Sequence, residues 1–160
     1  MSAEKKKLSI ILFSGDFDKA IAAFTLATGS AAVNYEVNLF FTFWGLNIIK
    51  NKSRYTFPGK GLLAKIFVFL MGTLKNAPLS KLNFWGASPL LMTGMMKKRN
   101  VATLKELIQA AKDLGINFYA CEMSMVILGL TKADFFPEVK DVLAVPKFLE
   151  LSKDGQTLFI

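Results

Sequence analysis

Short apolar runs alternate along the chain with segments of helical spacing, which is the pattern of an α/β protein. Residues 7–13 form an apolar run of strand length, and Asp16 follows it as a candidate helix N-cap. Apolar residues then recur at roughly helical spacing over 17–29. Residues 36–43 are rich in aromatic and branched side chains, which predicts a second strand. The order strand–helix–strand predicts a βαβ unit and therefore a parallel sheet.

The second half of the chain repeats this alternation. Thr103 and Glu106 have the spacing of a capping box, which predicts the start of a helix. The expected elements are, in order, a helix over 103–114, a strand over 116–121, a helix around 125–130, a strand over 141–145, a helix over 146–153 and a short strand over 156–160. Together they predict an α/β fold, a three-layer α/β/α sandwich with four or five mainly parallel strands.

Residues 47–100 interrupt the alternation. Prolines and glycines divide this segment, and two short apolar helices are expected near 62–70 and 89–98. An insertion of this length between two strands commonly carries a lid, a binding surface or an oligomer contact. The sequence thus predicts one domain over 1–160 with a helical apolar insertion at 47–100. The insertion has four methionines that either fill the core, the commoner outcome, or form an adaptable apolar patch: Met71, Met92, Met95 and Met96.

The chain is 160 residues long, and its mean hydropathy of +0.38 is high for a soluble domain. The most apolar window, 61–72, is shorter than the roughly 20 residues that cross a bilayer. We therefore expect peripheral membrane contact, or burial of this window between subunits, in place of a transmembrane span. One cysteine and the lack of an N-terminal export signal predict a cytoplasmic protein.

The net charge of +8 is compatible with an anionic partner, although lysines scattered over a soluble surface are the commoner cause of such a charge. The tight basic clusters are Lys5-Lys6-Lys7 and Lys97-Lys98-Arg99. Neither cluster alternates with aromatic residues, as a groove for a nucleic acid strand requires. We therefore expect no nucleic acid partner.

Composition excludes several kinds of catalytic site. The chain has no histidine, which removes Ser-His-Asp and Cys-His catalysis and most zinc and non-haem iron sites. One cysteine cannot hold an iron–sulfur cluster or form a Cys-x-x-Cys pair. Gly59-Lys60-Gly61 lacks the P-loop pattern. The carboxylates Asp16, Asp18 and Glu122 have no spacing that marks a catalytic pair. We expect neither a metal nor a cofactor.

Cys121, the single cysteine, ends the apolar run 116–121, and Ser124 is placed to cap the helix that follows. Ligand sites of open α/β sheets lie beyond the carboxyl ends of the strands. A thiol in that position faces a helix N-terminus, whose dipole and unpaired N–H groups stabilise a thiolate or persulfide anion. A lone cysteine in a strand is otherwise a small buried hydrophobic residue. From the residues alone, both interpretations stay open.

The motif around Cys121 points to a known family. Residues 119–125, Tyr-Ala-Cys-Glu-Met-Ser-Met, with Gly129 downstream, resemble the cysteine motif of the DsrE/DsrF-like sulfur-relay family. The likeness is to the branch with an Ala-Cys-x-Met-Ser-Met signature, often labelled peroxiredoxin-like. It extends over much of the chain and includes the turn at 14–16 and the Phe-Trp-Gly end of the second strand at 43–45.

The resemblance implies a flavodoxin-like subunit that assembles into trimers or hexamers. It also implies that Cys121 accepts sulfane sulfur as a persulfide and passes it to a thiol protein such as a TusA-like carrier. In that interpretation, Met123, Met125 and Trp44 shield the persulfide from water. Ser124 holds the outer sulfur of the persulfide.

Three functions compete at this point. The first is a sulfur carrier or sulfurtransferase that acts through Cys121. The second is a non-catalytic scaffold that binds a membrane or a partner protein, with a structural Cys121. The third is a thiol-dependent reductase or one-cysteine peroxidase, which needs an external resolving thiol because the chain has no second cysteine.

The chain departs from the resembled family at one position of the motif. Val126 stands where that family frequently has Asp or Asn, so the chain has no polar group at that position.

Overall fold

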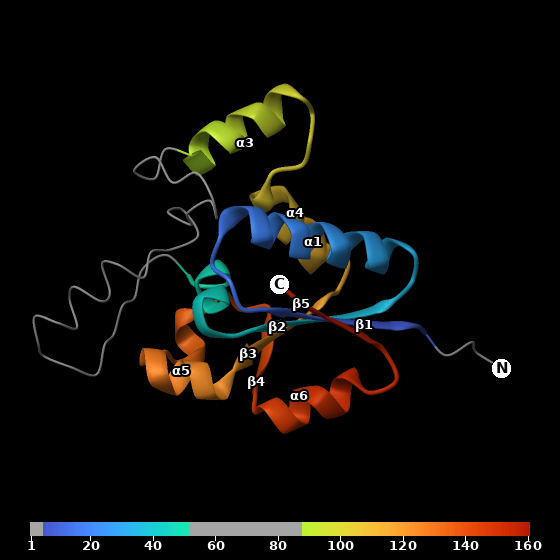
Figure 1. Ribbon diagram of the computed structural model, residues 1–160, viewed down its shortest axis with the longest axis vertical. Helices are drawn as coiled ribbons and strands as arrows, with labels where there is room; N and C mark the ends of the chain where they lie inside the picture. The colour runs from blue at the N-terminus through green and yellow to red at the C-terminus, as the bar shows by residue number, and fades with distance from the viewer. Residues whose placement is uncertain (1–4, 52–87) are drawn as a thin grey trace, which may run out of the picture.

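The computed structural model describes residues 5–51 and 88–160. At its centre is a five-stranded sheet of order β4-β3-β2-β1-β5, in which every neighbouring pair is parallel (Figure 1). The elements are, in chain order, β1 (Lys7–Leu12), α1 (Phe17–Ala32), β2 (Glu36–Phe41), the 3-10 helix η1 (Phe43–Ile48), α3 (Ser88–Lys98), α4 (Leu104–Asp113), β3 (Asn117–Cys121), α5 (Glu122–Leu128), the 3-10 helix η3 (Lys132–Asp134), β4 (Val139–Leu143), α6 (Val145–Ser152) and β5 (Gln156–Phe159). The predicted α/β class and parallel sheet are confirmed.

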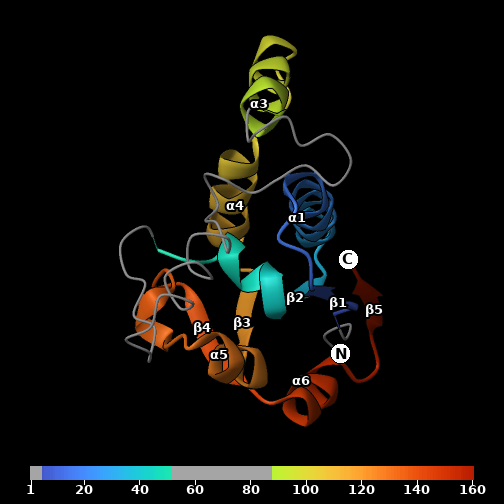
Figure 2. The same ribbon diagram turned by 60° about the vertical axis from the view of Figure 1, so that its left-hand side comes forward.

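Helices cover both faces of the sheet. Figures 1 and 2 show α1 and α4 side by side on one face and α6 on the other. Alternate residues of a strand point to opposite faces. In β1, Ile10 is buried in the main core with residues of α1, whereas Ile11 packs against a smaller cluster that contains Phe148 of α6. The sheet therefore separates two apolar layers, which explains why its central strands are apolar throughout.

Three phenylalanine rings from different elements pack together in the main core. Phe24 of α1 lies 6.2 Å from Phe41 of β2 and 6.2 Å from Phe118 of β3, measured between ring centroids. The rings of Phe41 and Phe118 are 6.1 Å apart. All three side chains are fully buried. Tilted aromatic contacts at this separation add to the free energy gained by burial, so these rings hold α1 across the β2–β3 pair.

The observed boundaries differ from the predicted ones where the local backbone departs from the pattern. β2 ends at Phe41 instead of residue 43, because Phe43 takes a left-handed conformation with φ of 45° and begins η1. β4 begins at Val139, two residues before its expected start. α1 continues past its expected end at Gly29 and stops at Ala32, since one glycine in a helix costs only about 1 kcal/mol relative to alanine.

Two of the predicted helix caps, at Thr103 and Asp16, have different outcomes. Thr103 forms a complete capping box: its Oγ1 accepts from the N–H of Glu106 at 3.4 Å, and its own N–H donates to Glu106 Oε2 at 2.7 Å. The bonds that the N–H and the hydroxyl of Thr103 donate to Glu106 Oε2 lower the pKa of Glu106. Asp16 occupies the N-cap position of α1, but its side chain makes no capping hydrogen bond. Its carboxylate instead pairs with Lys19 at 3.1 Å, so the predicted side-chain cap is wrong.

The structure describes the two ends of the segment predicted as an insertion. η1 and the residues just after it form the first end, and α3 confirms the helix expected near 89–98. The helix expected near 62–70, the apolar window 61–72 and Met71 lie outside the described residues. Within 5–51 and 88–160, none of the helices combines the length and the apolar character that a membrane crossing needs.

At Gly45, η1 packs tightly against the end of β1. The N–H of Gly45 donates to the carbonyl of Phe13 at 2.9 Å, and the N–H of Thr42 donates to the carbonyl of Leu12 at 3.0 Å. A Cβ atom built on Gly45 would collide with the carbonyl oxygen of Leu12. Only a residue without a side chain permits this approach. The contact determines how the chain leaves the carboxyl end of β2.

We expect Gly45→Ala to lower the free energy of unfolding by about 1–3 kcal/mol, the usual cost of overpacking. Gly29→Ala is the matched control, because a Cβ at this position in α1 meets no atom within 4 Å. In a helix this replacement stabilises by roughly 0.5–1 kcal/mol. Urea unfolding followed by circular dichroism measures both variants. Equal stability of the two would show that η1 does not press against β1 in solution.

Candidate functional site

Cys121 lies at the carboxyl edge of the sheet. It is the last residue of β3 and the N-cap residue of α5. Its side chain belongs to a buried cluster with Phe40, Tyr119, Leu143 and Phe148. Only 1% of Cys121 is exposed. The thiol is therefore enclosed by apolar side chains.

Strand alternation determines which face receives the thiol. Ala120 points into the main core, so the neighbouring Cys121 points to the α6 face of the sheet. Cys121 is paired in register with Leu143 of β4. On the same face, Phe40 of β2 and Phe148 of α6 stack, with ring centroids 4.3 Å apart and 13° between the ring planes. This stack holds α6 over the cluster that contains the thiol.

Ser124 does not cap the helix after Cys121, contrary to the sequence prediction. β3 passes into α5 without an intervening turn, so the helix begins at Glu122 and its N-cap position falls on Cys121. Ser124 consequently lies inside the first helical turn and is fully buried. Its hydroxyl forms a 2.8 Å hydrogen bond with the hydroxyl of Thr42. This bond joins the end of β2 to the start of α5.

The three residues expected to shield a persulfide have different surroundings. Met125 is buried and belongs to the main core, not to the Cys121 cluster. Met123 of α5 is 52% exposed, and Trp44 of η1 is 41% exposed. None of the three belongs to the buried cluster around the thiol, and their shielding of a persulfide stays a prediction. The aromatic residues of β2, β3 and α6 enclose it instead.

α5 has an exposed apolar surface that the sequence pattern did not predict. Met123, Val126 and Ile127 are all more than half exposed, and they follow the i, i+3, i+4 spacing of one helix face. Met125 and Leu128 are buried on the other side of the helix. The signal was present, because a short helix that is apolar on all sides must expose part of its apolar surface when only one side is packed.

Aromatic side chains line the far end of the same edge. The ring of Phe13 lies 5.3 Å from Phe43 and 5.9 Å from Phe159, centroid to centroid. Phe13 and Phe159 are exposed, as are all four residues of β5. Contiguous apolar surface of this kind is typical of regions that contact another protein.

A buried lysine follows η1, where the sequence gave no reason to expect burial. Lys50 pairs with Phe135 in an isolated antiparallel bridge, and the N–H of Asn51 donates to the carbonyl of Asp134 at 2.8 Å. Burial lowers the pKa of Lys50, and the negative charge of Asp134 partly opposes that shift. These contacts attach the chain after η1 to the connection between α5 and β4.

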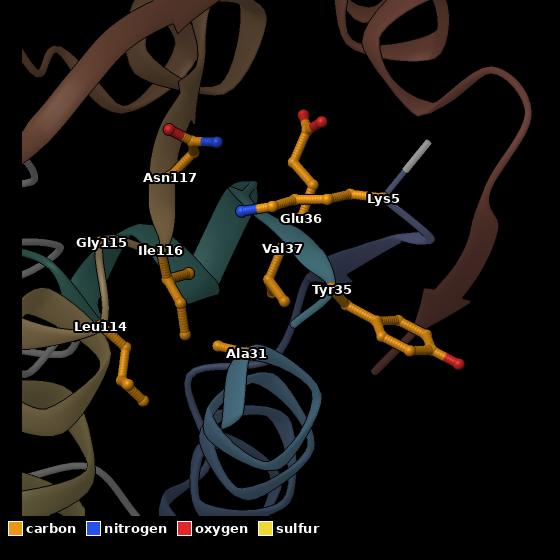
Figure 3. A pocket seen from close by; sticks show the side chains of 9 residues that line it. All are labelled: Lys5, Ala31, Tyr35, Glu36, Val37, Leu114, Gly115, Ile116 and Asn117. Carbon is orange, nitrogen blue, oxygen red and sulfur yellow. The ribbon is translucent and has the colours of Figure 1, made fainter. Parts of the chain in front are cut away.

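A cavity of about 280 Å³ lies at the opposite, amino edge of the sheet (Figure 3). Val37 and Ile116 contribute apolar lining, and Glu36 and Asn117 contribute polar lining. The Asn117 Oδ1 atom already accepts a 3.0 Å hydrogen bond from the Lys140 ammonium group. Because Asn117 begins β3 and Cys121 ends it, this cavity is separate from the thiol.

The fold and the site together define a class: small α/β proteins with an all-parallel five-stranded sheet and a cysteine where the third strand meets a helix. A family model described as the DsrE/DsrF/DrsH-like family matches residues 4–160. The chain belongs to this family, and the resemblance found from residues 119–125 is confirmed.

Two relatives and two solved structures illustrate the similarity. The uncharacterized protein YrkE of Bacillus subtilis (strain 168) is 40% identical over 163 residues, with 100% of each chain covered. The sulfur carrier protein DsrE2 of Allochromatium vinosum is 34% identical over 141 residues, with 86% of this chain and 87% of that protein covered.

The solved structures show the same fold at low sequence identity. MTH1491, a protein of unknown function from Methanobacterium thermoautotrophicum, has a TM-score of 0.54 at 12% identity, with 98% of this chain and 100% of that chain covered. YchN of E. coli has a TM-score of 0.50 at 10% identity, with 97% of this chain and 99% of that chain covered. Both likenesses concern the fold alone.

Thr42→Val and Ser124→Ala each remove one partner of a buried hydrogen bond. We expect each to lower the free energy of unfolding by roughly 1–3 kcal/mol, because the remaining hydroxyl loses its partner. The double variant should be less destabilised than the sum of the two by about 0.5 kcal/mol or more. Denaturant unfolding of all four proteins completes the cycle. Strict additivity would indicate that the two hydroxyls do not interact in solution.

Proposed function

We propose that the protein is a sulfur carrier that accepts sulfane sulfur as a persulfide on Cys121 and passes it to the thiol of a partner protein such as a TusA-like carrier. The family and the relative named sulfur carrier protein DsrE2 support a role in sulfur relay. We assign the persulfide to Cys121 because it is the only cysteine of the chain and ends a parallel strand at the carboxyl edge of the sheet.

Sulfur transfer of this kind proceeds by two nucleophilic displacements. The Cys121 thiolate attacks the outer sulfur of a donor persulfide, a new S–S bond forms, and the donor thiolate leaves. A thiolate of the recipient then attacks the outer sulfur on Cys121, takes that sulfur and releases the Cys121 thiolate. Each displacement forms one S–S bond and breaks another, so no external oxidant or reductant is consumed.

The enclosed position of the thiol suits storage more than rapid exchange. Apolar side chains around Cys121 keep water and small thiols away from a stored outer sulfur. Loading and release then need a transient opening of the cluster. We propose that α6 moves away from the sheet to open the cluster. This helix is short, with eight residues, and its Val145 and Leu149 are exposed to solvent. Moving α6 leaves the sheet intact.

The two exposed apolar surfaces suit two kinds of protein contact. Met123, Val126 and Ile127 directly follow the thiol in the chain, so we assign them to the sulfur donor or recipient. The aromatic surface around Phe13 and Phe159 at β5 is assigned to contacts between copies in a trimer or hexamer. We place this exchange in the cytoplasm, where thiols remain reduced.

Intact-protein mass after incubation with thiosulfate or polysulfide tests the proposal. The wild type should gain whole sulfur atoms that dithiothreitol removes, and Cys121→Ser should gain none. Cys121→Ala is a second control, because serine at this N-cap position adds a capping group that cysteine does not supply. A wild type that gains no sulfur from any donor, with a thiol that resists alkylation when folded, would make Cys121 a structural residue and favour the scaffold function.

Phe148→Leu tests the opening of α6. Loss of the aromatic stack on Phe40 removes about 0.5–1.5 kcal/mol, so the cluster should open about two- to tenfold more often. We expect alkylation of Cys121 by iodoacetamide in the folded protein to accelerate by the same factor. Leu149→Ala changes the exposed neighbour on the same helix and should leave the rate unchanged. Equal rates in both variants would mean that the thiol is reached by another route.

A further inference from the structure

α3 presents an apolar face that the described parts of the chain leave exposed. Figures 1 and 2 show this helix at one end of the molecule, beyond α4 and away from the strands. Met92 and Met96 are partly buried against the main core, as the core-filling interpretation of the methionines predicts. Leu90, Leu91 and Met95 are 77%, 64% and 60% exposed. The packing of α3 on the core therefore uses only one side of the helix.

Helical geometry gathers basic residues with these apolar ones. On a helix of 3.6 residues per turn, Leu90, Leu91 and Met95 fall on one continuous arc. Lys98 falls on the same arc and Lys97 at its edge, less than one turn past Met95, and both are exposed. The outward face is thus apolar in its first two turns and basic at its end.

The basic end of α3 has a defined geometry. The N–H of Val101 donates to the carbonyl of Met96 at 2.9 Å, and Asn100 takes a left-handed conformation with φ of 54°, as in a Schellman motif. Residues 97–99 are consequently presented together and are exposed. Basic residues at a helix C-terminus interact favourably with the helix dipole. That interaction accounts for the charges but leaves the exposed leucines unexplained.

Charge along the chain is distributed unevenly around this helix. None of the twelve Asp and Glu residues lies between Glu36 and Glu106, whereas eleven of the twenty Lys and Arg residues do. α3 lies within this acid-free stretch, and Lys105, which follows in α4, is also exposed. In space, Glu106 faces this cluster, since besides the hydrogen bonds from Thr103 the charge of Lys97 helps to lower its pKa. With Lys98 and Arg99 beyond Lys97, the apolar and basic face of α3 complements a surface that is negative outside and apolar beneath.

We infer that α3 docks the protein on an anionic phospholipid bilayer. Leu90, Leu91 and Met95 enter the headgroup layer. Residues 97–99 bind the negatively charged headgroups. An acidic protein partner would account for the charges without the exposed leucines, and a groove for single-stranded nucleic acid needs aromatic stacking residues, which α3 lacks. The inference does not depend on sulfur transfer, so Cys121→Ser should bind vesicles as the wild type does.

Flotation with vesicles of phosphatidylcholine, with or without phosphatidylserine, tests the charged part of the surface. The wild type should bind only the vesicles that contain phosphatidylserine. Each basic residue near an anionic surface contributes about fivefold to binding, so K97Q/K98Q/R99Q together should weaken the partition coefficient by on the order of a hundredfold. K5Q/K6Q/K7Q removes the same charge from the N-terminal cluster and should weaken binding much less. Equal loss in both triple variants would overturn the inference, because it would show unspecific attraction.

Leu90→Ser with Met95→Ser tests the apolar part of the surface. Two exposed side chains that enter the headgroup layer should contribute at least about tenfold to binding. Val126→Ser with Ile127→Ser removes exposed apolar area from α5 and should leave vesicle binding unchanged. Circular dichroism and thermal unfolding confirm that all variants fold. The inference is overturned if the wild type does not bind phosphatidylserine vesicles. It is also overturned if residues 97–99 bind polyglutamate or RNA instead of the vesicles.

Discussion

All five strands run parallel, and this constraint decides where the chemistry and the contacts of the molecule fall. Parallel strands end at one edge of the sheet, so each connection leaves from that edge and returns to the other. Thr42, at the end of β2, and Ser124, at the start of α5, meet at this edge and share a buried hydrogen bond. Gly45 allows the next turn to approach β1 closely. The position of Cys121 therefore depends on the neighbours of β3 as much as on its own motif.

The features that the sequence predicted correctly have local signals. Apolar runs and a Thr–Glu spacing are visible within a few residues, so the strands and the capping box before α4 could be placed. The role of Ser124 could not, because a helix cap depends on the residue at which the preceding strand stops, and β3 runs directly into α5. Local reasoning left burial of the thiol as one of two open interpretations. Alternation along β3 determines the face on which Cys121 lies, but α6 covers that face from a later part of the chain.

The two inferred activities occupy different sides of the molecule. In Figure 2, α3 lies at one end, past α1 and α4, and α6 lies at the other, beyond the sheet. A protein held on a bilayer by α3 would direct α6 and the thiol cluster towards the aqueous side. Partner proteins could then reach the exposed residues of α5 without competing with lipid. Under this arrangement, membrane docking would bring the carrier close to membrane-bound partners and leave the sulfur chemistry unchanged.

The first and last strands of the chain lie side by side, with Leu8 opposite Gln156. The N–H of Phe13 donates to the carbonyl of Ile160, and the N–H of Ile160 donates to the carbonyl of Ile11. One side of β1 consequently has no partner until β5 has left the ribosome. Contacts with such a large sequence separation slow folding, and an unpaired strand edge is prone to association with other chains. During synthesis, the nascent protein therefore carries an open edge on β1 until β5 emerges, more than 140 residues later.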